Sequence, residues 1–526
     1  MVAKTFQGLE DVLRDELIAL GAQNVEIGTR MVSFEGDKAL MYKANLCCRT
    51  ALRILVPIVK FTAEDTDQLY DFVRDFDWDQ YLTPDSTFAI DSTVNSHEFT
   101  HSRFVTYRVK DGIVDHFNDK YGRRPSIRLN SPDLILNVHI ADTRVTISLD
   151  SSGEPLSKRG YRAEQTEAPV NEVLAAGIIL KTGWRGDSNF VDPMCGSGTF
   201  LIEAALIAAN INPGIYREGF AFERWKDFDP ELFNEIYNDD SAEKEFSHKI
   251  YGGDIDPEAV LITRKNLERA HVEEMVDVRC LPFEEWTDVP EPGILVTNPP
   301  YGERLKPESM ENLYRGIGKE LKQHFKGWHA WILGYRDEHF AAIGLRPSVK
   351  FPILNGSLEC SLREYVLFDG TYADFKTGGG SVKNEDFNRD FKPRTRHVSD
   401  DEWESETRRF RSERKNRDSR SERGSRDERR DFRRDSRRDD RKRDDRRRDS
   451  FRKEGEGRRD FRRDDRDDRR RDSFRKEGPK DRAPKKPKRD DYKQVTAKAP
   501  RLPESSTVFK TESKMRSRKR RNTDDQ

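Results

Sequence analysis

Two short motifs hold the residues of this chain whose types and spacing could do chemistry. The first is the glycine turn Asp192-Pro193-Met194-Cys195-Gly196-Ser197-Gly198-Thr199, and the second, about a hundred residues later, is Asn298-Pro299-Pro300-Tyr301. A glycine turn exposes backbone N–H groups to a ligand, whereas the second motif offers fixed acceptors and an aromatic face. Together they predict the transfer of a methyl group from a sulfonium cofactor to the amine of a planar base.

The second motif supplies the candidate catalytic residues. The amide oxygen of Asn298 and the carbonyl of Pro299 can both accept hydrogens of an exocyclic amine, which turns the nitrogen lone pair toward the donor. Tyr301 can stack on an extruded base, worth roughly 1–3 kcal/mol, against a few kcal/mol to unstack it. Positioning and electrostatics then suffice, and we expect no covalent intermediate and no metal. An ordinary strand-ending loop is the alternative.

The first motif is the candidate cofactor loop. It lacks the Gly-Lys-Ser/Thr of triphosphate loops and the G-x-G-x-x-G spacing of dinucleotide sites, although a strand-to-helix turn without a ligand remains an alternative. Asp254 ends the next predicted strand and is the candidate for the ribose hydroxyls, while Asp256 before Pro257 is better explained as a helix cap. The candidate cofactor-binding residues are Asp192, Pro193, Cys195, Gly196, Ser197, Gly198, Thr199, Asp254 and Glu172.

These motifs, with the continuation to Leu305 and the upstream Arg159-Gly160-Tyr161-Arg162, resemble those of the THUMP-domain RNA methyltransferases. The resemblance covers roughly residues 1–370, and it is strongest to the bacterial enzymes that methylate guanine N2 in 23S rRNA. It implies S-adenosyl-L-methionine as cofactor, an RNA partner, and contact of Asn298, Pro299 and Tyr301 with guanine. The alternatives are adenine N6 in RNA or DNA, a protein glutamine amide, or a non-catalytic RNA-binding assembly factor.

The chain departs from this family at two points. Family members often carry an acidic residue after the third strand, but here residues 275–279 run into Cys280-Leu281-Pro282, so adenine contact could fall to backbone groups or to Glu284. The longest relatives also carry a second methyltransferase domain at the C-terminus. This chain has a charged tail there, and we expect no second methylation activity.

The expected fold is α/β, a class I (Rossmann-like) methyltransferase domain preceded by an α+β ferredoxin-like/THUMP module. Its predicted parts are a ferredoxin-like unit (1–53), a THUMP domain (54–155), the methyltransferase domain (156–372) and a disordered tail (378–526). The patterns predict the following helices and strands. The helices are 9–20, 37–53, 103–117, 171–180 and 200–209, and the strands are 25–27, 32–34, 87–94, 134–139, 144–149, 189–192, 250–254, 275–279, 293–298 and 328–334, with a closing antiparallel pair near 354 and 362–368.

Basic residues gather at the loops of the expected THUMP domain and in the linker that follows it. As a set they are the candidates for contact with the RNA backbone, although each alone is better explained as a solvated charge. They are Arg103, Lys110, Arg123, Arg124, Arg128, Arg159 and Arg162.

The near-neutral total charge conceals two opposed halves. Residues 1–380 carry a net charge of −19 and residues 381–526 one of +18. The tail is nearly free of Leu, Ile and Val, so it cannot bury enough apolar surface to offset the entropy of ordering. Its arginines and scattered phenylalanines could attract RNA, or the tail could pair mostly with itself and serve solubility.

The sequence indicates a cytoplasmic protein. No stretch reaches membrane-spanning length, and the N-terminus lacks the apolar core of a signal peptide. The five cysteines show neither zinc spacing nor a disulfide framework, which suits a reducing compartment. The sequence does not indicate the oligomeric state.

Overall fold

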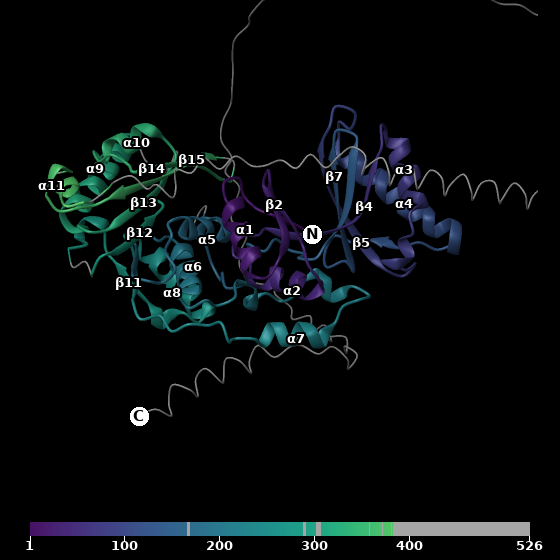
Figure 1. The fold of residues 1–526 in the computed structure, drawn as a ribbon, viewed down its shortest axis with the longest axis horizontal. Coiled ribbons are helices and arrows are strands. Elements are labelled where there is room, and N and C mark those ends of the chain that lie inside the picture. Colours follow the sequence, from purple (N-terminus) through teal and green to yellow (C-terminus); the bar gives the residue numbers. More distant parts are fainter. Residues whose placement is uncertain are drawn as a thin grey trace, which may run out of the picture. The chain divides into compact units, whose positions relative to one another are not determined.

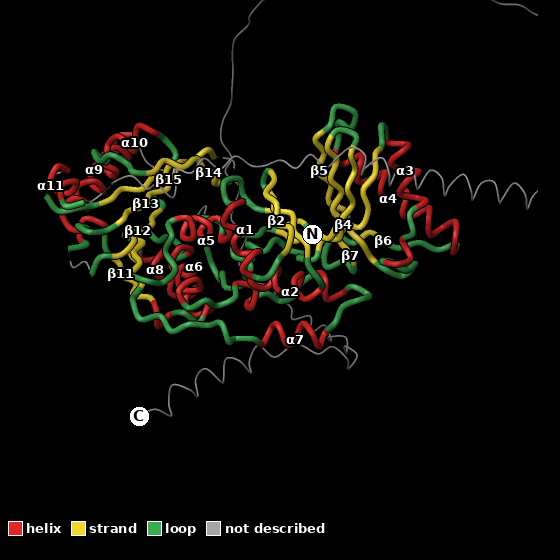
Figure 2. The backbone as a smooth tube through the Cα atoms, viewed as in Figure 1, coloured by secondary structure: helices red, strands yellow, loops and turns green. Residues whose placement is uncertain are grey.

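The computed structural model describes residues 1–165, 169–287, 291–300, 307–356, 358–370, 372–379 and 381. These residues form one eight-stranded and one seven-stranded β-sheet together with α-helices (Figures 1 and 2). The arrangement confirms the predicted α/β class. The Arg/Asp-rich tail from residue 382 onward and the candidate Tyr301 lie outside the described residues.

The first sheet has the strand order β2-β3-β1-β4-β8-β7-β5-β6. Its strands are β1 (Val2–Lys4), β2 (Gln23–Gly28), β3 (Met31–Glu35), β4 (Arg53–Thr62), β5 (Thr87–Asn95), β6 (Ser126–Ile127), β7 (Leu134–Ala141) and β8 (Arg144–Asp150). The long strand β4 joins the two N-terminal units, because Leu55 pairs with Val2 of β1 on one side and with Asp150 of β8 on the other. The predicted limit between residues 53 and 54 falls at the start of this shared strand.

The helices of this part are α1 (Glu10–Ala19), α2 (Lys38–Cys47), α3 (Thr66–Asp75) and α4 (Ser102–Tyr121), with a 3-10 turn η1 (Trp78–Gln80). The prediction of a helix over 37–53 is wrong at its C-terminal end. The carboxylate of Asp37 caps α2 through the N–H of Leu40, but Cys48 already has extended backbone. The N–H of Leu52 then bonds to the carbonyl of Lys4, so the chain enters the sheet instead of extending the helix.

The second sheet has the order β11-β10-β9-β12-β13-β15-β14. Its strands are β9 (Asn189–Asp192), β10 (Ile250–Asp254), β11 (Val276–Cys280), β12 (Gly293–Thr297), β13 (His329–Gly334), β14 (Val349–Asn355) and β15 (Leu358–Val366). The first five strands of this order, β11 to β13, run parallel to one another. Strand β15 pairs antiparallel with β13 and with β14, so the sheet closes with the predicted antiparallel pair. Strand β9 lies between β10 and β12, and ligands of such sheets bind at the carboxyl ends where the order switches.

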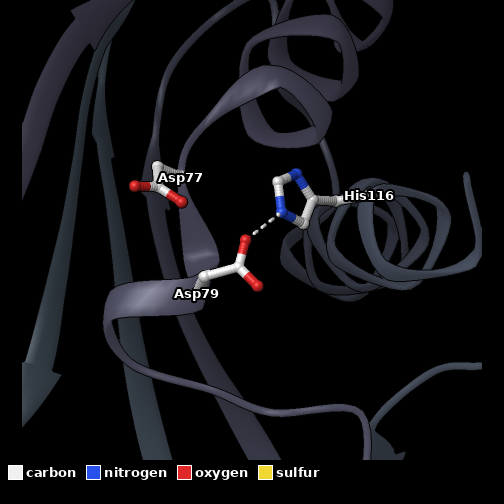
Figure 3. Close-up of side chains that lie close together, drawn as sticks. All are labelled: Asp77, Asp79 and His116. Carbon is white, nitrogen blue, oxygen red and sulfur yellow. Dashed lines mark hydrogen bonds and ion pairs between the residues drawn. The ribbon is translucent and has the colours of Figure 1, made fainter. Parts of the chain in front are cut away.

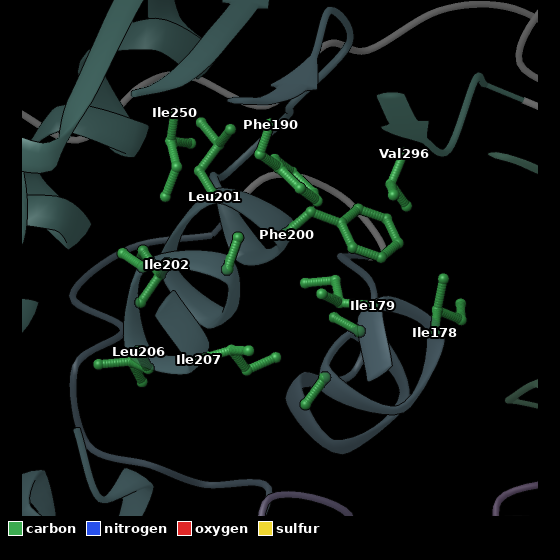
Figure 4. Packing of buried hydrophobic residues seen from close by; sticks show 14 of the residues in the cluster. Ile178, Ile179, Phe190, Phe200, Leu201, Ile202, Leu206, Ile207, Ile250 and Val296 are labelled. Atoms are coloured by element: carbon green, nitrogen blue, oxygen red, sulfur yellow. The ribbon is translucent and has the colours of Figure 1, made fainter. Parts of the chain in front are cut away.

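Helices flank this sheet and supply its core. They are α5 (Glu172–Lys181), α6 (Thr199–Ala208), α8 (Pro257–Ala270), α9 (Pro307–His324), α10 (Asp337–Ala342) and α11 (Tyr372–Thr377), with 3-10 turns η4 (Glu273–Met275) and η5 (Phe283–Glu285). Every residue of α6 is buried, as expected for a helix that is apolar on all sides. Figure 4 shows Phe200 of α6 and Ile179 of α5 near Phe190 of β9. This packing fixes the start of α6, where the cofactor loop ends.

The segment 210–249, whose purpose the sequence did not reveal, forms turns η2 (Pro213–Tyr216) and η3 (Ala221–Arg224) and helix α7 (Pro230–Asn238). Phe222 stacks on Tyr42 of α2 with ring centroids 4.5 Å apart. The guanidinium of Arg224 donates to the carbonyl of Pro132 at 2.7 Å, and the ammonium of Lys226 donates to two carbonyls of the η1 region at 2.8 Å. The segment therefore anchors on the N-terminal part of the chain.

Candidate active site

Three predicted residues meet at the carboxyl ends of neighbouring strands. Asp192 ends β9 and Asp254 ends β10, while Asn298 directly follows β12. Strand β9 pairs in parallel with both neighbours, with Gly252 beside Asp192 and Leu295 beside Val191. The cofactor motif and the amine motif therefore share one edge of the sheet.

The glycine turn is held by hydrogen bonds to β10. The N–H of Cys195 donates to the carbonyl of Gly253 at 2.8 Å, and the N–H of Gly196 donates to Oδ2 of Asp254 at 2.9 Å. Gly198 has φ +80°, and a Cβ there would lie 2.8 Å from Cγ2 of Thr263. A side chain at this position would be strained and would clash, so the turn requires glycine.

Two carboxylates that lie two residues apart have different roles. Asp256 caps α8 by accepting from the N–H of Glu258 at 3.0 Å, which confirms the predicted cap. Asp254 bridges the turn and the helix start, because its second oxygen accepts from the N–H of Asp256 at 3.0 Å. Between them Ile255 is 72% exposed, a large apolar surface that the flat ring of a bound nucleoside could cover. Ile255 was not among the predicted site residues, because the exposure of its side chain is visible only in the folded chain.

Asp192 joins the cofactor loop to the strand of the amine motif. Its Oδ1 accepts a hydrogen bond from the hydroxyl of Thr297 at 2.8 Å and one from the N–H of Met194 at 3.3 Å. Both Asp192 and Thr297 are 1% exposed. Burial raises the pKa of Asp192 to about 7, with a further rise from the charge of Asp254.

Asn298 presents a buried acceptor that has no partner within the described part of the chain. Its Oδ1 is inaccessible to solvent and unpaired, while the next residue, Pro299, is buried and Pro300 is exposed. A buried polar atom left without a hydrogen bond costs about 1–3 kcal/mol, and native proteins rarely keep one without reason. An acceptor in this state suits a ligand that brings its own N–H donor.

Arg162 lies against the cofactor loop. Its guanidinium donates to Oε1 of Glu172 at 2.7 Å, to Oγ of Ser197 at 2.9 Å and to Oγ1 of Thr199 at 3.0 Å. The side chain is only 16% exposed. These hydrogen bonds favour a role for Arg162 in holding the loop, and its contact with RNA stays a prediction.

The burial of Arg159 speaks against the predicted contact of this residue with RNA. Arg159 is 2% exposed and faces the fully buried Glu203 of α6, with Nε 3.4 Å from Oε1. Its guanidinium also donates to the carbonyl of Arg49 at 2.5 Å, and the hydroxyl of Tyr161 donates to Glu203 at 2.9 Å. Burial raises the pKa of Glu203, and the charge of Arg159 opposes that rise. A buried pair of this kind serves the packing of α6.

Helix α8 supports the loop from behind, through two residues that sequence analysis missed. The hydroxyl of Thr263 donates to the carbonyl of Gly196 at 2.7 Å, and the amide of Asn266 donates to the carbonyl of Ser197 at 3.0 Å. Both side chains are fully buried. The signal was available, because two buried polar residues three apart lie on one face of a helix.

Cys195 has no nucleophilic role in this arrangement. Its side chain is buried, and burial raises the pKa of the thiol well above its ordinary value. A thiol that stays protonated is a poor nucleophile. The loop position fits the expected role of a small residue.

Comparison with known proteins places these motifs in a family. Residues 1–55 match the RlmL ferredoxin-like domain, residues 63–150 the THUMP domain, and residues 159–364 the RMKL-like methyltransferase domain. A Synechocystis protein named as an RNA methyltransferase is 37% identical over 369 residues, which cover 70% of this chain and 96% of that protein. The chain belongs to the THUMP-domain RNA methyltransferases.

Longer members of the family match over part of their length. The ribosomal RNA large subunit methyltransferase K/L of Syntrophotalea carbinolica is 39% identical over 373 residues, or 68% of this chain and 52% of that protein. The chain therefore spans about half the length of such relatives.

Two solved structures of similar proteins cover the same 70% of this chain. One is a methyltransferase in complex with SAH, 32% identical with a TM-score of 0.64 over 98% of that chain. The other is a Listeria monocytogenes protein named as an N6-adenine-specific DNA methylase, 31% identical with a TM-score of 0.63 over 95% of that chain. Like other methyltransferases of this family, the protein uses S-adenosyl-L-methionine. The glycine turn beside Asp254 and the exposed Ile255 is compatible with that nucleoside.

The family's THUMP domain carries the remaining candidates for RNA contact. Arg103, Arg124 and Arg128 are exposed. Arg123 forms an ion pair with Asp85, and the ammonium of Lys110 lies 2.7 Å from the carboxylate of Asp111. Nothing in these contacts prevents an RNA phosphate from competing for the charges, so the assignment stays a prediction.

One group in the described part of the chain has metal-compatible spacing, Asp77, Asp79 and His116 (Figure 3). Oδ2 of Asp79 already lies 2.6 Å from the ammonium of Lys120 and 3.2 Å from Nε2 of His116. These donors lower the pKa of Asp79 even though burial opposes the shift. The group is a hydrogen-bonded junction between η1 and α4.

In the described chain no helix is long and apolar enough to cross a membrane.

Proposed function

We propose that this protein methylates the exocyclic N2 of a guanine in large-subunit ribosomal RNA. The observation that carries the proposal is the buried, unpaired Oδ1 of Asn298, at the same sheet edge as the cofactor loop. The printed names of the K/L relatives support ribosomal RNA as the substrate. A ribosomal RNA substrate would agree with the expected cytoplasmic location.

The chain's own residues hold and orient the amine. Oδ1 of Asn298 accepts one amine hydrogen and the carbonyl of Pro299 the other, so the nitrogen lone pair turns toward the cofactor loop. Bound S-adenosyl-L-methionine would supply the methyl group: the N–C bond would form as the S–C bond breaks, S-adenosylhomocysteine would leave, and the nitrogen would then release one proton to water. Because both acceptors are fixed before the reaction, they stabilise the developing positive charge on nitrogen without reorganising. Tyr301 is the candidate to stack on the flipped guanine.

The cofactor residues divide into those that contact the ligand and those that hold the loop. Asp254 would accept the ribose hydroxyls, and the backbone of Gly196 to Gly198 would border the cofactor. Asp192, Pro193, Cys195 and Thr199 shape the turn. Glu172 and Ser197 both accept hydrogen bonds from the guanidinium of Arg162, which holds Glu172 beside the loop.

The test is methyl transfer by the purified full chain to ribosomal RNA from a strain that lacks the gene, with labelled S-adenosyl-L-methionine and mass analysis of the nucleosides. We expect N2-methylguanosine at one large-subunit position. If N6-methyladenosine is the only methylated product, the target base is adenine and not guanine. Adenine is the base in the name of the Listeria protein. Cofactor binding without any methylated nucleoside would instead favour a non-catalytic assembly factor.

A further inference from the structure

Helix α4 carries all three aromatic side chains that are strongly exposed among the described residues. Phe104 is 54% exposed, Tyr107 60% and Tyr121 46%. The hydroxyl of Tyr121 is bonded to Asp79 at 2.5 Å, and its ring stacks on Phe117. Phe104 and Tyr107, by contrast, make no ring stack with any residue that the structure describes. Two exposed, unstacked rings one helical turn apart form an apolar patch of the kind that marks a binding site.

The core packing of α4 explains why these two rings face outward. Val105, Val109 and Ile113 recur every four residues and are buried against the sheet. Arg108 is turned toward α3, where its guanidinium lies 4.2 Å from the ring centroid of Tyr70. Residues that differ by three, four or seven share one helix face. Arg103, Phe104, Tyr107 and Lys110 are therefore gathered on the free side of the first turns.

The basic residues of this face indicate which kind of partner it binds. Residues 99–110 contain Arg103, Arg108 and Lys110. Arg108 pairs with Asp67 and Lys110 with Asp111, so Arg103 is the basic residue of this stretch that has no ion pair with any residue that the structure describes. The ammonium of Lys110 lies 5.9 Å from the ring centroid of Tyr107. Aromatic rings beside basic groups suit unpaired nucleotides, whose bases stack while their phosphates meet the cations. A duplex hides its base faces and could use only the charges.

We propose that Phe104 and Tyr107 form a stacking platform for an unpaired segment of the substrate RNA, with Arg103 on a neighbouring phosphate. The inference rests on the proposed function, because it takes RNA as the substrate. It adds a base-contacting site on the THUMP domain, separate from the methyl-transfer pocket. The platform would select RNA with a single-stranded stretch beside the target.

The first test maps contacts on the full chain. A 4-thiouridine-labelled single-stranded RNA is cross-linked by light, and mass spectrometry locates the attached peptide. We expect a cross-link within residues 103–110. This position distinguishes the platform from the Arg-rich tail, which could bind the same RNA. Cross-links confined to other segments would overturn the proposal.

The second test measures affinity of the full chain for the same single strand and for a blunt duplex of equal length. The double variant Phe104→Ala/Tyr107→Ala should weaken single-strand binding about tenfold and duplex binding little, since a stacked base contributes roughly that factor. The loss should stay similar as salt rises. Arg103→Ala should instead reduce the salt slope by about 0.7. Ile18→Ala, a change at another exposed apolar side chain, is the matched control.

Three outcomes contradict the platform. The double variant could bind the single strand as tightly as wild type, or lose duplex and single-strand affinity equally. It could also change the sedimentation coefficient, which would make the surface a contact between two copies of the chain. Methylation of ribosomal RNA in the same preparations tells the failures apart. If the wild-type protein methylates ribosomal RNA but the double variant binds RNA as wild type does, only the platform is refuted. If the wild-type protein does not methylate ribosomal RNA, the proposed function is refuted.

Discussion

Oδ1 of Asp192 accepts a hydrogen bond from the hydroxyl of Thr297 across 2.8 Å, although the two residues are 105 positions apart. Asp192 begins the cofactor loop and Thr297 directly precedes Asn298. The bond therefore ties the turn that we propose to hold the methyl donor to the strand that precedes Asn298, the proposed acceptor for the amine. A small displacement of reacting atoms is costly in catalysis, so this cross-strand bond is part of the positioning.

The buried carboxyl of Asp192 predicts a pH-dependent stability. Its pKa is raised from 3.8 to about 7 in the folded chain, so the native state keeps a proton that the unfolded state releases. The contribution of this proton to the free energy of unfolding is fully present below about pH 4 and is lost as pH rises through 7. Asp192→Asn cannot ionise, and its advantage in urea midpoint over wild type should grow between pH 4 and 7 and then level off. A difference in urea midpoint that stays constant from pH 4 to pH 7 would contradict the raised pKa of Asp192.

Asp254 and Asp256 offer a matched pair for cofactor binding. Asp254→Ala removes the acceptor for the ribose and for the N–H of Gly196, and we expect affinity for S-adenosylmethionine to fall about 10- to 100-fold, as lost hydrogen bonds to a charged group would give. Asp256→Ala removes only a helix cap, which costs about 1 kcal/mol of stability. Its cofactor affinity should stay near wild type by calorimetry. Equal losses in both variants would remove Asp254 from the site.

Arg162 predicts a loop-positioning effect. Arg162→Lys keeps the charge, but one ammonium cannot bridge Glu172 and the two loop hydroxyls as the planar guanidinium does. Cofactor affinity should weaken about tenfold, with a smaller change in kcat at saturating cofactor. Arg185→Lys is the control, because Arg185 bonds to carbonyls before β9 begins. A weaker RNA affinity with unchanged cofactor affinity would instead support the predicted contact with RNA.

The charged tail predicts a salt effect on RNA binding. Residues 381–526 carry a net charge of +18 while the preceding part is acidic, so removing the tail after Gly380 should lower RNA affinity at low salt. The slope of log affinity against log salt should become less steep, because fewer counterions are released. An identical slope would assign the tail to solubility.

The strands that carry the site were predictable because they are buried on both faces. The runs that became β9, β10 and β12 are short and mostly buried; β9 ends at Asp192, β10 ends at Asp254, and Asn298 directly follows β12. Parallel strands of this kind place their ends together. The assignment of the cofactor and amine motifs to one edge therefore followed from local pattern. The predicted domain limits and the roles of individual site residues remain proposals.

The arginines of the linker could not be assigned from the sequence. Arg159 and Arg162 stand three residues apart in a basic segment, which is typical of a phosphate-binding surface. Their partners, Glu203 and Glu172, come from helices α6 and α5 and are defined only by the packed fold. Long-range pairing of this kind leaves no local signal, and it places Arg159 in the packing of α6 and Arg162 against the cofactor loop.

The measurement that tests the account most directly is single-turnover methyl transfer by Asn298→Ala, with cofactor affinity measured on the same protein. Loss of a fixed polar group at a reacting centre lowers turnover by about 100-fold or more. We predict that loss with affinity for S-adenosylmethionine within about twofold of wild type, since Asn298 serves the amine and not the cofactor. A variant that methylates ribosomal RNA at the wild-type rate would contradict the proposed grip on the amine.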